Sequence, residues 1–154
     1  MRVERLGEGE PELAVVGGIH GDEPCGSRGV EHFLKERPDL ERPVAFIIAN
    51  EEATAASRRY IDADLNRSFP GDPDGDAHES RLAHAVGETV GDCVTLALHS
   101  TQSYDRMFAL VDEVAPPVAH LDDAAVVGPE PRLDRKSTRL NSSHSGESRM
   151  PSSA

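Results

Sequence analysis

Residues 13–24, LAVVGGIHGDEP, decide the fold that we expect for this chain. The apolar run LAVV leads directly into two glycines, a pattern typical of a buried strand that ends in a tight turn. The turn then carries His20, Asp22 and Glu23, although a purely structural turn needs only glycine, proline or a short polar side chain. Pro24 suits the first position of a following helix. We therefore expect a strand, a turn with ionisable side chains and a helix, in this order.

Further strands and helices are predicted along the chain. The first helix should continue to about Lys35, and Leu82, Val86 and Val90 mark a second amphipathic helix that ends at Gly91. Residues 51–78 are interpreted as a loop. Short apolar runs predict buried strands at residues 13–19, 44–50 and 93–99, with two more at 108–111 and 124–127. Strands that alternate with helices and are apolar throughout indicate an α/β protein with a largely parallel or mixed sheet covered on both faces.

Length and composition limit the possible classes of protein. The 154 residues are enough for one domain, and the net charge of −12 argues against nucleic acid as a partner. No apolar run is long enough to cross a bilayer, and the first ten residues are too charged for a signal peptide. We expect a cytoplasmic protein in which Cys25 and Cys93 are buried, reduced thiols.

Acidic residues greatly outnumber lysines in this chain. Lys35 is the only lysine before residue 134, whereas acidic residues are abundant. Acid-rich surfaces with little lysine suit solubility at high salt, where repulsion between charges is screened. A halophilic source is therefore one hypothesis and an ordinary acidic protein the other; thermal stability measured at low and at molar salt would separate them.

Residues 134–154 differ from the rest of the chain, because they are rich in serine and basic residues. A disordered tail is one interpretation. However, residues 134–144 can be back-translated into a common sequencing-library adapter, and residues 148–154 into the constant segment that follows it. We therefore interpret this tail as a translated artefact and residues 1–133 as the N-terminal part of a catalytic domain.

Two histidines are predicted to lie where strands end. His20 follows the strand at 13–19 and His99 ends the strand at 93–99. In open α/β sheets, ligands bind beyond the carboxyl ends of the strands, so these residues could meet there with Glu23 beside them. Two imidazoles and one carboxylate form the ligand set of a catalytic zinc site, with the fourth position left for water. The glycines at 17, 18 and 21 would let the backbone approach such a site closely.

A second group of polar residues lies in the segment 57–71, SRRYIDADLNRSFPG. It contains Arg59, Asp64, Asn66 and Arg67. Guanidinium groups bind carboxylates in a bidentate manner, and a nearby amide can add an orienting hydrogen bond. An arginine cluster in so acidic a protein suggests an anionic substrate, but a structural ion-pair network with neighbouring aspartates explains it equally well at this stage.

Three motifs together resemble a known family. HGDE at 20–23, RYIDADLNR at 59–67 and LHST at 98–101 are similar to motifs of the succinylglutamate desuccinylase/aspartoacylase family of zinc-carboxypeptidase-like hydrolases, and they occur in the same order. The resemblance implies a three-layer α/β/α sandwich around a mixed, mostly parallel sheet. It also implies hydrolysis of the amide bond of a small anionic N-acyl amino acid.

The same resemblance assigns roles to residues. It implies one zinc ion per chain, bound by His20, Glu23 and His99, with Arg59 helping to polarise the scissile carbonyl. It further implies substrate binding at the 64–67 segment, where Asn66 and Arg67 hold a substrate carboxylate and Asp64 supports the arginine cluster.

One element of the family pattern has no match. The general base of the family is a glutamate on a later strand, and none of the acidic residues after His99 stands in a matching context. We therefore expect an incomplete C-terminal part and negligible turnover by the 154-residue chain. Alternatives are a peptide carboxypeptidase with the same ligands, an iron oxygenase with two histidines and one carboxylate, and a metal-binding fragment without activity.

Overall fold

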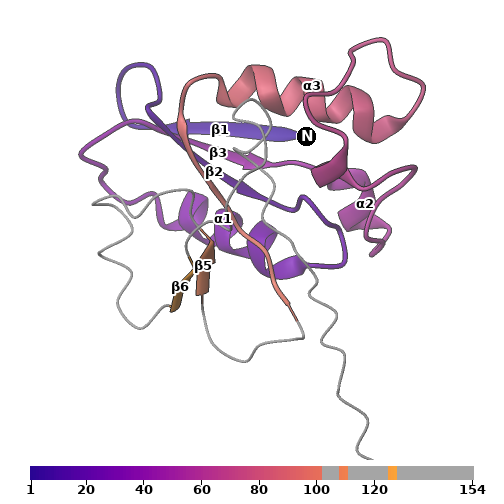
Figure 1. Cartoon of the computed structure of the whole chain (residues 1–154). Helices are drawn as coiled ribbons and strands as arrows, with labels where there is room; N and C mark the ends of the chain where they lie inside the picture. Colours follow the sequence, from indigo (N-terminus) through magenta and orange to yellow (C-terminus); the bar gives the residue numbers. More distant parts are fainter. Residues whose placement is uncertain (102–107, 111–124, 128–154) are drawn as a thin grey trace, which may run out of the picture.

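Four strands form the sheet at the centre of the fold. The computed structural model of the chain describes residues 1–101, 108–110 and 125–127 (Figure 1). The strand order is β1-β3-β2-β4, with β1 antiparallel to β3 and the other neighbours parallel. The bounds are β1 (Arg2–Leu6), β2 (Leu13–Gly17), β3 (Val44–Ile48) and β4 (Val94–Ala97). Two further short strands, β5 (Phe108–Leu110) and β6 (Ala125–Val127), pair in parallel with each other.

Two long helices and two short ones connect the strands. Helix α1 (Pro24–Glu36) begins with the expected proline, and α3 (His78–Val90) ends at Gly91, whose φ of 48° closes the helix. The segment expected to be loop contains the short helix α2 (Glu51–Ala55) and the 3₁₀ turn η1 (Leu65–Arg67). Asn50 and Asp64 cap these two turns through their side chains, which is why such short helices form.

The sheet has a hydrophobic core on each face. Residues of β3 alternate between them: Phe46 packs with Val30 of α1, and Ile47 packs with Val86 of α3. Figure 1 shows α3 over one face of the sheet and α1 under the other. All five residues of β3 are buried, as expected of a strand covered on both sides. The predicted three-layer α/β/α sandwich with a mixed sheet is confirmed.

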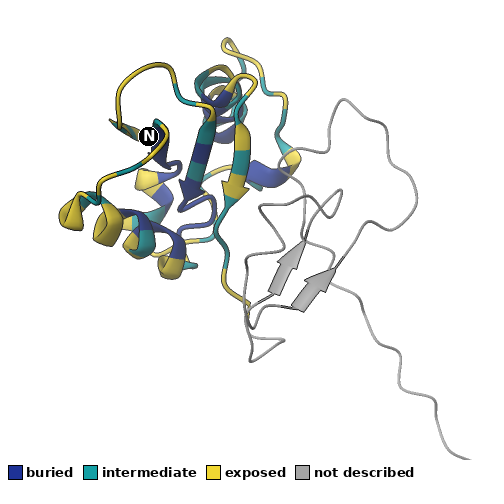
Figure 2. Ribbon diagram, turned by 90° about the vertical axis from the view of Figure 1, so that its left-hand side faces the viewer, coloured by how far each residue is buried: buried dark blue, intermediate teal, exposed yellow. Residues whose placement is uncertain are grey.

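Two expectations about individual segments were wrong, and one strand was missed. Strand β4 is not buried, because β2 is its only partner among the described strands (Figure 2). Its residues Val94 and Leu96 are 64% and 50% exposed. Strand β1 was not predicted, because three of the five residues in RVERL are charged; the strand lies at the sheet edge, where it pairs on one side only. Cys25 and Cys93 were both expected to be buried. Cys25 is exposed on α1 and Cys93 is half-buried, and neither forms a disulfide.

Two further sequence-based expectations concern the C-terminal tail and the membrane. Residues 134–154, and with them the division of the chain at residue 133, lie outside the described residues. Within the described part of the chain, no helix combines the length and the apolar character that a bilayer span requires.

Candidate metal centre

The two histidines meet because the strands that precede them are neighbours. Strands β2 and β4 are parallel and adjacent, so their carboxyl ends reach the same edge of the sheet. The pairing continues one step further, since the Leu98 N–H donates to the carbonyl of Val16 at 2.8 Å. His99 follows Leu98 directly, His20 lies three residues beyond the end of β2, and their ring centroids are 5.2 Å apart.

The turn before His20 is fixed by backbone contacts. Gly18 has a φ of +66°, and the carbonyls of Gly17 and Gly18 accept hydrogen bonds from the segment that follows β3. A Cβ at Gly17 would collide with the backbone of Gly26 in α1, and one at Gly21 with the backbone of Ala53 in α2. The expectation that these glycines give the backbone close access to a ligand is therefore corrected: they allow segments of the protein itself to pack closely.

Glu23 lies at the centre of the site. Its Oε1 is 2.8 Å from Nδ1 of His20 and accepts a hydrogen bond from Nη1 of Arg59 at 2.9 Å. Its Oε2 is 2.9 Å from Nδ1 of His99 and accepts a hydrogen bond from the Ser100 N–H at 3.2 Å. One ligand atom from each of His20, Glu23 and His99 lies within 4.8 Å of the others, so the three could hold a metal ion.

The electrostatics of the site follow from these contacts. Burial alone would raise the pKa of Glu23, but the hydrogen bonds from His20 and His99 outweigh it and lower that pKa. For the His20 imidazole, burial alone would lower the pKa. Its hydrogen bonds to Glu23 and Asp64 outweigh burial, so the pKa of His20 is raised. An ionised carboxylate faced by two imidazoles fits a divalent metal ion, which takes the place of protons on such ligands.

Asp64 holds the other side of His20. Its Oδ1 lies 3.1 Å from Nε2 of His20, so that both ring nitrogens of this buried imidazole face a carboxylate. Arg59 bridges the two acids, with Nη1 at 2.9 Å from Glu23 and Nη2 at 3.7 Å from Asp64. The structural ion-pair network considered from the sequence is therefore present, and it includes a candidate metal ligand.

Asn66 and Arg67 sit beside this network on η1. Asn66 is 4% exposed, and neither its Oδ1 nor its Nδ2 has a hydrogen-bond partner among the described residues. The Arg67 side chain is exposed and makes no ion pair within residues 1–101. A buried amide without partners costs free energy, so this pair of side chains is suited to receive a ligand.

Glu79 was missed by the sequence analysis. Its carboxylate is fully buried at the start of α3, with 0% exposure, and accepts hydrogen bonds from the loop at 61–63. The only signal was a glutamate in the first turn of a predicted helix, which is a common position for an exposed acid. Burial against a distant loop is a tertiary property and left no pattern in the sequence.

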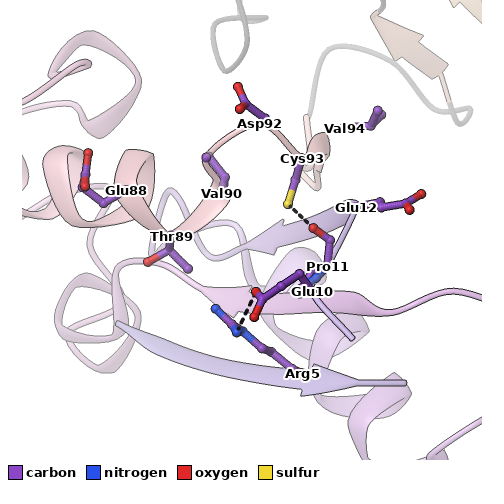
Figure 3. A pocket seen from close by; sticks show the side chains of 11 residues that line it. Arg5, Glu10, Pro11, Glu12, Glu88, Thr89, Val90, Asp92, Cys93 and Val94 are labelled. Atoms are coloured by element: carbon purple, nitrogen blue, oxygen red, sulfur yellow. Dashed lines mark hydrogen bonds and ion pairs between the residues drawn. The ribbon is translucent and has the colours of Figure 1, made fainter. Parts of the chain in front are cut away.

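A separate hollow opens near the amino ends of β2 and β4, away from the candidate metal centre (Figure 3). Its wall is acidic and includes Glu10, Glu12, Glu88 and Asp92, and the Cys93 thiol donates to the carbonyl of Pro11 at 3.1 Å. Among the described residues, the three that could hold a metal are all at the other edge of the sheet. The hollow therefore offers no comparable chemistry.

The fold and the His–Glu–His cluster define an α/β/α protein with a candidate metal site at the carboxyl edge of its sheet. Residues 9–127 match the succinylglutamate desuccinylase/aspartoacylase catalytic domain. The chain belongs to this family, which confirms the resemblance inferred from the three motifs.

Individual relatives agree with this assignment. The mouse N-acyl-aromatic-L-amino acid amidohydrolase (carboxylate-forming) is 39% identical over 114 residues, which cover 62% of this chain and 36% of that protein. The crystal structure of an aspartoacylase family protein from Mesorhizobium loti matches 75% of this chain and 40% of its own, with a TM-score of 0.61 and 28% identity. Murine aminoacylase 3 matches 69% and 41%, with a TM-score of 0.55 and 29% identity. The chain thus spans less than half the length of these relatives, and the family to which it belongs contains amidohydrolases.

Proposed function

We propose that the protein hydrolyses the amide bond of small N-acyl amino acids with the help of one zinc ion held by His20, Glu23 and His99. The observation that carries this proposal is the convergence of both Nδ1 atoms on the two oxygens of Glu23, at 2.8 and 2.9 Å. The amidohydrolase relative and the family of deacylases support the reaction type.

Zinc fits the donors better than a harder cation does. Imidazole nitrogens with one carboxylate are typical catalytic zinc ligands, whereas magnesium and calcium prefer oxygen ligands alone. When bound, zinc would supply Lewis acidity to the reacting carbonyl. The protein's own contribution is to hold His20 between Glu23 and Asp64, so that its ring cannot rotate away.

The substrate carboxylate would bind at η1. The exposed guanidinium of Arg67 can form two parallel hydrogen bonds with a carboxylate, and the unpartnered amide of Asn66 can add a third. This arrangement selects substrates with a free carboxylate near the scissile amide. An N-acyl amino acid has this shape.

Arg59 would stabilise the negative charge that develops on the carbonyl oxygen during attack. Its side chain is 40% exposed while Nη1 binds Glu23, so part of the side chain remains open to solvent. Glu23 and Asp64 fix its position before substrate arrives, and a donor fixed in advance does not need to reorganise during the reaction.

Zinc titration of the metal-free chain by calorimetry tests the metal centre, with one ion bound per chain as the expected result. His20→Ala and His99→Ala should weaken binding by more than about 100-fold, beyond the effect of changing an outer contact. His32→Ala, an exposed histidine on α1, is the matched control. Equal zinc affinity in all three variants would reject the metal centre.

Substrate class is tested by adding N-acetyl and N-succinyl amino acids to the zinc-loaded protein, with binding and release of the free amino acid as the two readouts. Arg67→Ala should weaken binding of these anions by about 10- to 100-fold. Hydrolysis of short peptides with a free C-terminal carboxylate, and not of N-acyl amino acids, would favour a metallocarboxypeptidase. The exposed Arg67 suits that substrate class as well.

A further inference from the structure

Glu79 carries a carboxylate that is saturated with hydrogen bonds inside the protein. Its Oε1 accepts from Nδ2 of Asn50 at 2.9 Å and from the Ile61 N–H at 2.6 Å. Its Oε2 accepts from the N–H groups of Asp62 and Ala63 at 2.9 and 3.0 Å. Both oxygens are therefore occupied, and Glu79 cannot also act on a substrate.

The loop binds this carboxylate through three successive backbone N–H groups. Such a series of N–H groups forms a concave anion site. The contact is reciprocal, because Oδ2 of Asp62 accepts from the His78 N–H at 2.8 Å at the start of α3, where Ala77 provides no side-chain cap. Helix and loop thus hold each other at two points.

The segment held by Glu79 lies between two residues that touch the candidate metal centre. Arg59 lies two residues before it in the chain and donates to Glu23 at 2.9 Å. Asp64 follows it and lies 3.1 Å from His20. A displacement of residues 61–63 would therefore move both contacts together.

We propose that Glu79 is a positioning residue, which fixes the loop at 61–63 and thereby sets Arg59 and Asp64 against the metal ligands. The inference rests on the proposed function, since it assigns a role toward the same site. The electrostatics agree with it: burial alone would raise the pKa of Glu79, but the hydrogen bonds from the loop N–H groups and Asn50 lower it to about 2.

Hydrogen exchange of the backbone amides tests the local effect. In Glu79→Gln, the new NH2 group cannot accept a hydrogen bond and the one remaining oxygen serves only some of the loop N–H groups, so exchange at residues 61–63 should accelerate by about 10- to 100-fold. Exchange at Ile47 in β3 should stay unchanged. Glu88→Gln removes an exposed carboxylate from the same helix and is the matched control, in which the amides at 61–63 should keep their protection.

Ligand binding tests the consequence for the site. Zinc affinity and the affinity of the zinc-loaded chain for N-acetyl-L-phenylalanine should each fall by about 10-fold or more in Glu79→Gln and stay unchanged in Glu88→Gln. If Glu79→Gln does not fold, Glu79→Asp is used in its place. Aspartate keeps the charge but is shorter by one methylene, so we expect the same changes with smaller size.

Three results would overturn the inference. One is unchanged protection at 61–63 in a folded Glu79 variant. Another is a loosened loop with the zinc and probe affinities of the control. The third is loss of protection throughout the chain in both Glu79 variants, which would make Glu79 a general core residue. Failure of the unmodified chain to bind zinc or the probe would count against the proposed function, while exchange at 61–63 would still decide whether Glu79 holds the loop.

Discussion

Asp64 lies against the ring nitrogen of His20 that faces away from Glu23: Oδ1 of Asp64 and Nε2 of His20 are 3.1 Å apart. The same oxygen accepts the Asn66 N–H at 3.0 Å and so caps η1. One carboxylate therefore orients a candidate metal ligand and also shapes the turn that carries Asn66 and Arg67. The sequence had placed Asp64 with the arginine cluster, and its contact to Arg59 at 3.7 Å is the longest of these three.

Replacing Asp64 should weaken zinc binding, and the loss should be larger when the acceptor oxygen for His20 is removed than when one is kept. Asp64→Ala removes the acceptor for His20, and we expect a zinc affinity about 10- to 100-fold lower, the usual effect of losing such an outer contact. Asp64→Asn keeps an acceptor oxygen and should lie between this variant and the unmodified chain. Zinc calorimetry measures both, with the exposed Asp74→Asn as control. An affinity equal to that of the control in Asp64→Ala would contradict the orienting role.

The two buried asparagines should respond in opposite ways to truncation. Asn66→Ala removes an amide without partners among residues 1–101, so the free energy of unfolding should stay unchanged or rise by up to about 1 kcal/mol. Asn50→Ala removes the bonds to Ala53 and Glu79 and should cost about 1–3 kcal/mol. Urea unfolding at neutral pH measures the difference. A large loss of stability in Asn66→Ala would show that this amide is structural and not kept for a ligand.

Glu79 should make the stability depend on pH in the acid range. Its folded-state pKa of about 2 lies below the usual glutamate pKa of 4.5, so its contribution to stability is complete above pH 4.5 and is lost as the pH falls toward 2. The loss is at most about 3 kcal/mol. The difference in unfolding free energy between the unmodified chain and Glu79→Gln should therefore shrink on acidification; a constant difference would exclude this linkage.

Two glycines should differ sharply in their tolerance of a methyl group. At Gly21 a Cβ would collide with the backbone of Ala53, so Gly21→Ala should cost about 3 kcal/mol or more and displace the turn that carries His20 and Glu23. At Gly87, within α3, a Cβ meets nothing within 4 Å, and Gly87→Ala should stabilise by about 0.5–1 kcal/mol. Thermal unfolding of both variants checks the pair. An equal change in stability in the two variants would mean that the turn and α2 can move apart without a cost in free energy, and would contradict this prediction.

The sequence alone determined the elements that depend on local pattern. The apolar runs before His20 and His99 predicted β2 and β4, and glycine and proline marked the limits of α1 and α3. The sequence also predicted that His20, Glu23 and His99 lie together, because the carboxyl ends of parallel neighbouring strands reach one edge of the sheet. These are consequences of side-chain periodicity and of a topology with few alternatives.

Tertiary structure alone decided which partner each polar side chain has. Nothing local distinguishes Glu79 from an exposed first-turn glutamate, and nothing local makes Asp64 a partner of His20 rather than of an arginine. The exposure of β4 and the pairing of the charged strand β1 likewise depend on which strands lie beside them. A hydrogen bond between residues far apart in the chain requires a short distance and a suitable angle between donor and acceptor. Local sequence pattern specifies neither the distance nor the angle; only the folded structure does.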